Sequence, residues 1–469
     1  MKKFSLTLFT IFFPILQVFA SEDHGISGSD FSLLWVIPFA GILLSIALFP
    51  LFASEFWHHH FGKVSTFWAL LLLIPMVVTF GVSHTSYEVL HVYLLEYIPF
   101  IVLLLALFTI AGGVRIKGDM VGTPALNTLL LLIGTLLASW MGTTGAAMLL
   151  IRPLLKANAW RANKVHVVIF FIFLVANIGG SLTPLGDPPL FLGFLQGVSF
   201  FWTTSNLLVE MSFLVVSLLA IFYIMDSFLY KKETHKPPVH KNGEQFGIDG
   251  GHNLVLLLGV IGAVLFSGFV KLDHLTVYHI EIPLENLIRE LALITLTIIS
   301  IKTTSQESRK ANDFDWFPIV EVGKLFAGIF VTIIPAIAIL KVGKEGALGA
   351  IINLVTNSDG SPNNDMYFWT TGLLSSFLDN APTYLVFFNT AGGAANVQHL
   401  MNEMSHTLMA ISSGAVFMGA MTYIGNAPNF MVKSIAESSG IKMPSFLGYM
   451  GWSIAILIPL FFLVTLIFI

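Results

Sequence analysis

Two short segments of the sequence combine the residue types that could bind an ion inside a membrane. Residues 183–189 (TPLGDPP) and 422–428 (TYIGNAP) both follow the pattern T-x-x-G-[DN]-x-P. Proline lacks an N–H and glycine permits unusual backbone angles, so each segment should unwind a helix. The freed carbonyls and half-helix ends, with the oxygens of Thr183, Thr422 and Asn426, could then coordinate Na⁺ or hold anionic oxygens. A single kink of this kind is common in membrane helices, and its recurrence is what indicates a site.

A second pair of segments should form re-entrant hairpins. Residues 121–157 turn at 142–145 (GTTG), and residues 366–392 turn at 379–383 (DNAPT). Irregular backbone at membrane depth is stable only when it is buried in protein or lines a polar cavity. An uncompensated charge there costs at least about 2.5–3.5 kcal/mol, so Asp187 and Asp379 should be paired or exchange protons. The alternative is a structural carboxylate that caps a half-helix.

The composition predicts the elements that must position these residues. The chain has 469 residues, of which 55% are hydrophobic and 11% charged, and its mean hydropathy is +0.83. Its apolar runs are long enough to cross a bilayer as helices, and the alternating strands of an outer-membrane barrel are absent. We expect an all-α polytopic membrane protein with about ten spans and two hairpins, which fits inverted repeats of five spans and one hairpin each.

Charge and segment patterns give the expected domains. Residues 1–20, with Lys2, Lys3 and a small-residue end at Ala20, are typical of a cleaved signal peptide, and an uncleaved extra helix is the alternative. Residues 21–230 form the first inverted repeat, 231–251 a cytoplasmic linker and 252–469 the second repeat. If the mature N-terminus lies outside and each span crosses the membrane in turn, Lys and Arg concentrate in the cytoplasmic segments. This charge bias indicates a multi-pass protein of the bacterial inner membrane.

Several classes of function are disfavoured. The net charge of −4 and the lack of a basic cluster argue against nucleic acid as a partner, and the absence of cysteine excludes thiolate metal sites and thiol catalysis. No G-x-S-x-G, H-E-x-x-H or Walker A motif is found, so we expect neither an enzyme nor an ATP-driven pump. A channel is the weaker alternative to a secondary transporter, because inverted hairpins that meet at the bilayer midplane are typical of transporters.

Residues 179–189 (GGSLTPLGDPP) and 378–383 (LDNAPT) resemble the ion transporter superfamily, which includes D-type bacterial sodium/proton antiporters and citrate transporters. The resemblance covers nearly the whole mature chain. It implies a homodimer in the lipid bilayer, with a scaffold and a mobile domain that carries the site across the membrane. By motif position, the site would include Ser181, Thr183, Gly186, Asp187, Asp379, Asn380, Thr383, Thr422, Gly425 and Asn426, with Thr143 and Thr144 from the first hairpin.

One departure from the antiporters bears on the substrate. Their first hairpin carries an Asp-Asn pair where this chain has residues 142–145 (GTTG), and the chain also resembles the related citrate transporter family, which shares the Gly-Asp-Pro-Pro stretch. Neutral donors suit a carboxylate, whereas two buried aspartates suit Na⁺ and H⁺. The sequence favours sodium/proton antiport, with cation-coupled transport of citrate or another carboxylate as the alternative. No cofactor is expected other than Na⁺ as the transported or coupling ion.

Overall fold

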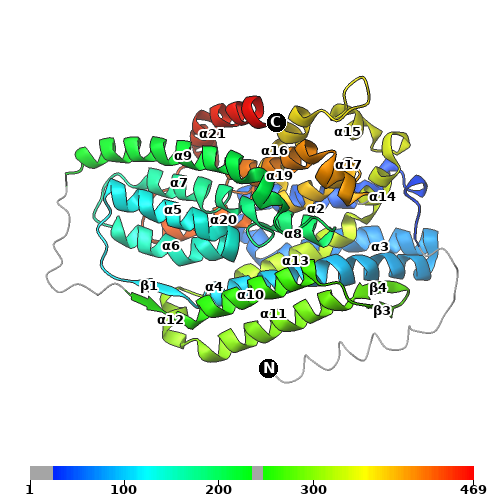
Figure 1. Ribbon diagram of the computed structural model, residues 1–469, viewed down its shortest axis with the longest axis horizontal. Helices are drawn as coiled ribbons and strands as arrows, with labels where there is room; N and C mark the ends of the chain where they lie inside the picture. Colours follow the sequence, from blue (N-terminus) through cyan, green and yellow to red (C-terminus); the bar gives the residue numbers. More distant parts are fainter. Residues whose placement is uncertain (1–24, 235–246, 394) are drawn as a thin grey trace.

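The structure is a computed structural model that describes residues 25–234, 247–393 and 395–469 (Figure 1). By length and composition, seven of the described helices could cross a membrane, or up to eight if a bent pair counts as one span. The protein is therefore an all-α polytopic membrane protein, as the sequence predicts. The predicted signal peptide and the middle of the predicted linker lie outside the described residues.

The first half begins with three apolar helical segments. Ser54–Ala111 is a helical stretch of 58 residues, which would be about 87 Å long if straight, against a hydrocarbon core of about 30 Å. Gly81 has non-helical angles (φ 81°, ψ 166°) inside it and divides it into two spans. The elements are η2 (Gly28–Asp30), η3 (Leu33–Val36), α2 (Ile37–Phe52), α3 (Ser54–Val92), the π-helix η4 (Tyr93–Tyr97) and α4 (Ile98–Ala111).

A hairpin, a broken helix and a long helix complete this half. Thr123 caps the hairpin's first helix, since its hydroxyl accepts from the Leu126 N–H at 3.2 Å. The broken helix restarts at Pro188 and Pro189, which can begin a helix because its first N–H groups need no partner within it. The hairpin consists of α5 (Pro124–Met141) and α6 (Thr143–Ala157). The broken helix consists of α7 (Val165–Leu174), η5 (Ile178–Leu182) and α8 (Pro188–Leu195), and the long helix is α9 (Trp202–Lys231).

The second half repeats this order. Its first elements are α10 (His252–Phe269), α11 (Leu284–Thr303), α12 (Gln306–Ala311), α13 (Phe317–Thr332), α14 (Ile334–Lys341), η6 (Gly343–Glu345) and α15 (Gly349–Leu354). The hairpin consists of α16 (Asn364–Leu378) and α17 (Asn380–Thr390), and the short α18 (Val397–Asn402) follows it. The broken helix consists of α19 (Ser405–Phe417), η7 (Met418–Met421) and α20 (Ala427–Ser438), and the last helix is α21 (Phe446–Phe468).

Two small antiparallel sheets lie at the ends of helices. β1 (Arg115–Lys117) pairs with β2 (Gly247–Asp249) and so joins the end of α4 to the segment before α10. β3 (His274–Val277) and β4 (Ile280–Pro283) form a hairpin. Its two turn residues, Tyr278 and His279, both have positive φ, as a type I′ hairpin turn requires.

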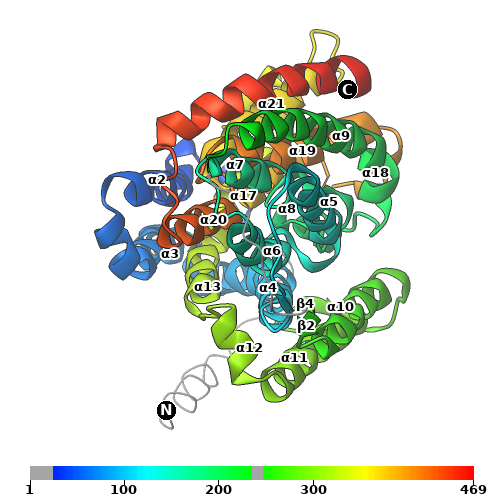
Figure 2. The ribbon, with the colours of Figure 1, turned by 90° about the vertical axis from the view of Figure 1, so that its left-hand side faces the viewer.

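Contacts between the halves are reciprocal. α13 packs against α3 as α4 packs against α11, and α20 packs against α6 as α8 packs against α17. Each of these contacts has a counterpart when the order of elements is matched between the halves, which fits two repeats around a two-fold axis. Figure 2 shows α6, α8, α17 and α20 near the centre, with α10 and α11 together on one side and α9 and α21 on another. The domain boundaries stay a prediction.

Candidate functional site

The two hairpins turn at residues with the same unusual backbone conformation. Gly142 has φ 81° and ψ 148°, and Asp379 has φ 71° and ψ 135°. Glycine adopts a positive φ readily, whereas a non-glycine residue in a sparsely populated region stores strain of about 1–3 kcal/mol, a feature that clusters at functional sites. Thr143 and Asn380 follow these residues and begin α6 and α17. Their side chains therefore come from the first turn of a half-helix.

Threonine hydroxyls tie the breaks of the two discontinuous helices to the hairpins. Thr183 Oγ1 donates to the Ser139 carbonyl, and Thr422 Oγ1 donates to the Ser376 carbonyl at 2.5 Å. Both threonines are buried and extended. Their hydroxyl protons are thus directed at backbone oxygens of the neighbouring hairpin, and each hydroxyl also accepts from a nearby N–H.

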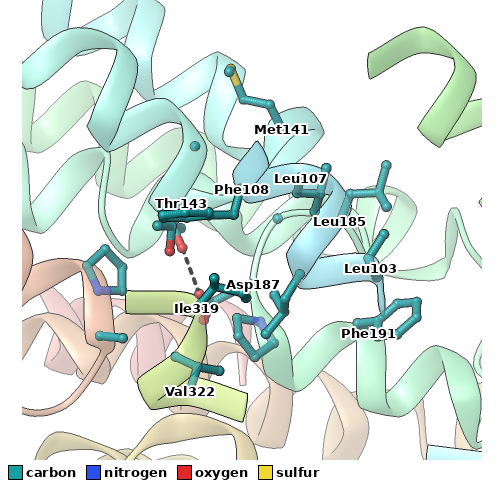
Figure 3. Close-up of a pocket in the computed structure, with 18 of the residues that line it drawn as sticks. Leu103, Leu107, Phe108, Met141, Thr143, Leu185, Asp187, Phe191, Ile319 and Val322 are labelled. Carbon is teal, nitrogen blue, oxygen red and sulfur yellow. Dashed lines mark hydrogen bonds between the residues drawn. The ribbon is translucent and has the colours of Figure 1, made fainter. Parts of the chain in front are cut away.

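Asp187 lies where the hairpins and broken helices meet. It is 2% exposed, and its Oδ1 accepts from Thr143 Oγ1 at 3.1 Å and from Asn426 Nδ2 at 3.0 Å. Its Oδ2 accepts from Asn380 Nδ2. Figure 3 shows Asp187 and Thr143 pointing toward each other. The carboxyl group therefore has three neutral donors from three different elements, and two of these donors, Asn380 and Asn426, belong to the second half.

A cavity of about 90 Å³ opens beside Asp187, enough for several water molecules. Its walls come from the first hairpin, the break before α8, the start of α20, and from α4 and α13 (Figure 3). Of the described residues that line it, Asp187 is the one charged residue, and the other polar side chains belong to Thr143 and Thr144. The apolar wall includes Leu103, Leu107, Phe108, Phe191, Ile319 and Val322.

Gly186 also belongs to the wall of this cavity, and the remaining predicted residues do not line it. Asp379 caps α17, because its Oδ1 accepts from the Ala381 N–H at 3.1 Å, and Thr383 Oγ1 donates to the Asp379 carbonyl at 2.8 Å. Ser181 Oγ donates to the Ile178 carbonyl at 2.9 Å. A Cβ on Gly186 or on Gly425 would lie within 2.5 Å or less of the backbone of a nearby glycine, so both positions require glycine for close packing.

Two asparagines that the motifs do not include extend the polar site. Asn177 Nδ2 donates to Asn429 Oδ1 at 2.7 Å, across the two halves. Asn429 Nδ2 in turn donates to the carbonyls of Gly419 and Thr422 at 2.8 and 2.9 Å. Both side chains are buried. A search for amide residues within a few positions of each helix break would have found them, since each interrupts an apolar run.

The donor set is one that suits a hard cation. Carboxylate, hydroxyl and amide oxygens are the ligands of Na⁺-like ions and Ca²⁺, and the buried Asn380 Oδ1 has no hydrogen-bond partner among the described residues. No group of three or more His, Asp or Glu that could hold a transition metal is found among the described residues.

The arrangement also brings four half-helix N-termini toward one region, because α6, α8, α17 and α20 each begin at a motif, and such ends favour negative charge.

Comparison with known proteins agrees with the geometry at a coarser level. A family model described as "Putative citrate transport" matches residues 28–469. An uncharacterized transporter of Synechocystis sp. is 25% identical over 320 residues, which are 64% of this chain and 68% of that protein. Uncharacterized transporters of Mycobacterium bovis and Mycobacterium tuberculosis are each 23% identical over 327 residues, covering 68% of this chain and 71% of theirs.

Proposed function

Because the chain belongs to the family described as "Putative citrate transport", it is a membrane transporter, and we propose that it exchanges Na⁺ for H⁺ at Asp187, driven by an ion gradient. The observation that carries this proposal is that Asp187 is buried and surrounded by neutral donors, and that it is the one charged residue among the described residues of the cavity wall. An uncompensated carboxylate is costly at membrane depth. It therefore needs either a proton or a cation.

That requirement is enough for exchange. A carboxyl that holds a proton or Na⁺, but not both, couples the two ions because each must leave before the other binds. Thr143 and the amide groups of Asn380 and Asn426 can offer oxygens to a cation in place of the N–H and O–H groups they now direct at Asp187. Within the described part of the chain, neither Lys nor Arg lines the cavity, which favours a cation over a free tricarboxylate.

Cation-coupled transport of citrate or another carboxylate is the second candidate. The family description favours it, and so do the N-termini of α6 and α8, which begin beside the cavity and could bind carboxylate oxygens. In this alternative, Na⁺ at Asp187 would supply the positive charge that the side chains of the cavity wall lack.

We also propose how the site moves and where it works. The cavity lies between α4 and α13 on one side and the first hairpin and the two broken helices on the other, so these two groups of helices are the candidates for a scaffold and a mobile domain. A shift of one group against the other would expose Asp187 to either side in turn. We expect this to take place in a homodimer in the bacterial inner membrane.

The two candidates can be separated in proteoliposomes loaded with a pH-sensitive dye. Under sodium/proton antiport, Na⁺ or Li⁺ added outside the vesicles should drive internal protons out and raise the internal pH. No carboxylate should be needed. Asp187→Asn should abolish this signal, and Asp365→Asn, which changes an exposed carboxylate at the start of α16, should not. Proton movement that requires citrate, or labelled citrate uptake that requires Na⁺, would replace antiport with symport. An active Asp187→Asn variant would overturn the assignment of the site.

A further inference from the structure

α9 carries a carboxyl group on the face that it buries in the protein. The buried stripe of this helix includes Leu207, Met211, Leu214 and Leu218, and Glu210 belongs to it with only 1% exposure. This spacing of three and four residues is that of one helix face. An apolar residue is expected at such a position, and an ionisable residue there indicates function by default.

Among the residues that the structure describes, none forms a hydrogen bond with either carboxyl oxygen of Glu210. Both Oε1 and Oε2 are buried. The hydroxyl of Ser413 on α19 lies beside the carboxyl group, but it donates to the Met409 carbonyl at 2.8 Å. Burial of an unpaired charge is far more costly than burial of a neutral carboxylic acid. The geometry therefore suits a glutamic acid that keeps its proton.

Charged groups on the packed elements do not compensate Glu210. α9 packs against α5, α7, η5, α19 and α21. Among the described residues of these elements, the ionisable side chains are His166 on α7, His406 on α19 and Tyr449 on α21. His166 pairs with Asp226 at 2.7 Å, sixteen residues or about 24 Å along α9 from Glu210. His406 is exposed, seven residues from Ser413, and Tyr449 OH donates to the Ala420 carbonyl at 2.8 Å.

We propose that Glu210 is a proton-binding site separate from Asp187 and that its proton takes part in transport. The step is a simple one, in which a carboxylate oxygen of Glu210 takes up H⁺ to give a neutral acid and later returns it. This inference rests on the proposed exchange of protons, and it adds a second proton to the cycle.

Two polar residues precede Glu210 on the same face of α9. Thr203, Asn206 and Glu210 are spaced three and four residues apart, so they share one face from the start of the helix. Thr203 Oγ1 donates to the Leu182 carbonyl at 3.0 Å, directly before the break at Thr183. Glu210 is thus about 10 Å along α9 from the contact with the broken helix, and α9 also packs against α5 of the first hairpin.

Infrared spectroscopy of the purified protein tests the proton directly. At neutral pH, the wild type should show a carboxylic C=O stretch that shifts in D₂O and is missing from Glu210→Gln. Asp187→Asn, as the control, should keep this band. A spectrum of Glu210→Gln with the same carboxylic bands as the wild type would overturn the proposal. If Glu210→Gln fails to fold, Glu210→Met provides the same comparison.

The number of protons exchanged per Na⁺ tests the role in transport. Measured from the reversal of flux under opposed pH and Na⁺ gradients, it should fall by one proton in Glu210→Gln, while stabilisation by Na⁺ stays as in the wild type. An unchanged ratio would show that the proton of Glu210 is only structural and would overturn the inference. The infrared measurement does not require transport. If the wild type does not exchange Na⁺ for H⁺, the proposed function is wrong, but the infrared band still shows whether Glu210 is protonated.

Discussion

Asp187 accepts a 3.0 Å hydrogen bond from Asn426, the residue at the same place in the other copy of the T-x-x-G-[DN]-x-P pattern. Both have extended backbone angles, with φ −142° and ψ 143° for Asp187 and φ −152° and ψ 140° for Asn426. The carboxyl group and its amide partner thus occupy matched positions and touch each other.

This relationship predicts that the carboxyl group can be moved from position 187 to position 426. Asp187→Asn should abolish cation-dependent proton exchange, because an amide of the same shape cannot bind a proton in competition with Na⁺. Adding Asn426→Asp should restore part of the activity, since it returns one carboxyl group to the same contact. Dye-reported exchange in proteoliposomes measures both variants, with Asn426→Ser as the control for loss of the asparagine. A double variant no more active than Asp187→Asn would argue that the two positions are not interchangeable.

The turn of the first hairpin should be sensitive to a single methyl group. Gly142→Ala places a Cβ at φ 81°, and we expect it to lower thermal stability by a free energy of about 1–3 kcal/mol. Gly262→Ala is the matched control, because it lies within α10, where a Cβ would have nothing within 4 Å. Thermal unfolding in detergent compares the two. Equal melting temperatures for both variants would contradict strain at the turn.

Thr183→Ala should weaken the apparent affinity for Na⁺ and leave some exchange. The variant loses the hydrogen bond to the Ser139 carbonyl, worth about 0.5–1.5 kcal/mol, so the break becomes less firmly held against the hairpin while Asp187 remains. Thr183→Ser retains the hydroxyl and should restore the affinity. Na⁺-dependent thermal shifts give the affinities, since ligand binding stabilises the folded protein by mass action. Full loss of exchange in Thr183→Ala would instead indicate a more direct role.

A pH-dependent contact is expected at the end of α9. Burial raises the pKa of Glu233, but hydrogen bonds from the N–H groups of Ala162 and Asn163, at 2.9 and 2.8 Å, and the nearby Arg161 lower it overall. The stabilisation is therefore present above the ordinary pKa of glutamate and is lost as the pH falls toward the lowered value. Glu233→Gln should lower thermal stability at neutral pH and make little difference in acid. Exposed Glu307→Gln should behave as the wild type, and a Glu233→Gln penalty independent of pH would contradict this account.

The re-entrant topology can be tested with single cysteines, because the chain has none of its own. Exposed positions flank both hairpins, namely Ala125 and Ala162 for the first and Ser358 and Ala395 for the second. Cysteines at Ala125 and Ala162 should be labelled only from the cytoplasm, and those at Ser358 and Ala395 only from outside. Labelling of Ala125 and Ala162 from opposite sides would show that the first hairpin crosses the membrane.

Local chemistry explains which features the sequence could predict. Both helix breaks follow from Pro and Gly, and so does the start of α8 at Pro188. Capping of a half-helix is the alternative role that the sequence predicts for a buried aspartate. Asp379 has this role, because it accepts a hydrogen bond from the Ala381 N–H. The contact between Asn177 and Asn429 could not be predicted, since it joins positions 252 residues apart. Glu210 was hidden in an apolar run because hydropathy averages over a window and does not show which face a residue occupies.

The difference between Asp187 and Asn426 has a consequence for how such a protein could arise. Two identical copies of one half would place two carboxyl groups at hydrogen-bond distance, and like charges so close cannot both ionise. The pair would then share a proton and lose the single well-defined choice between H⁺ and Na⁺. Divergence at this one position, with an acid in one copy and its amide in the other, resolves the conflict. A duplicated gene could therefore acquire this chemistry only after its two copies had become unequal at the axis.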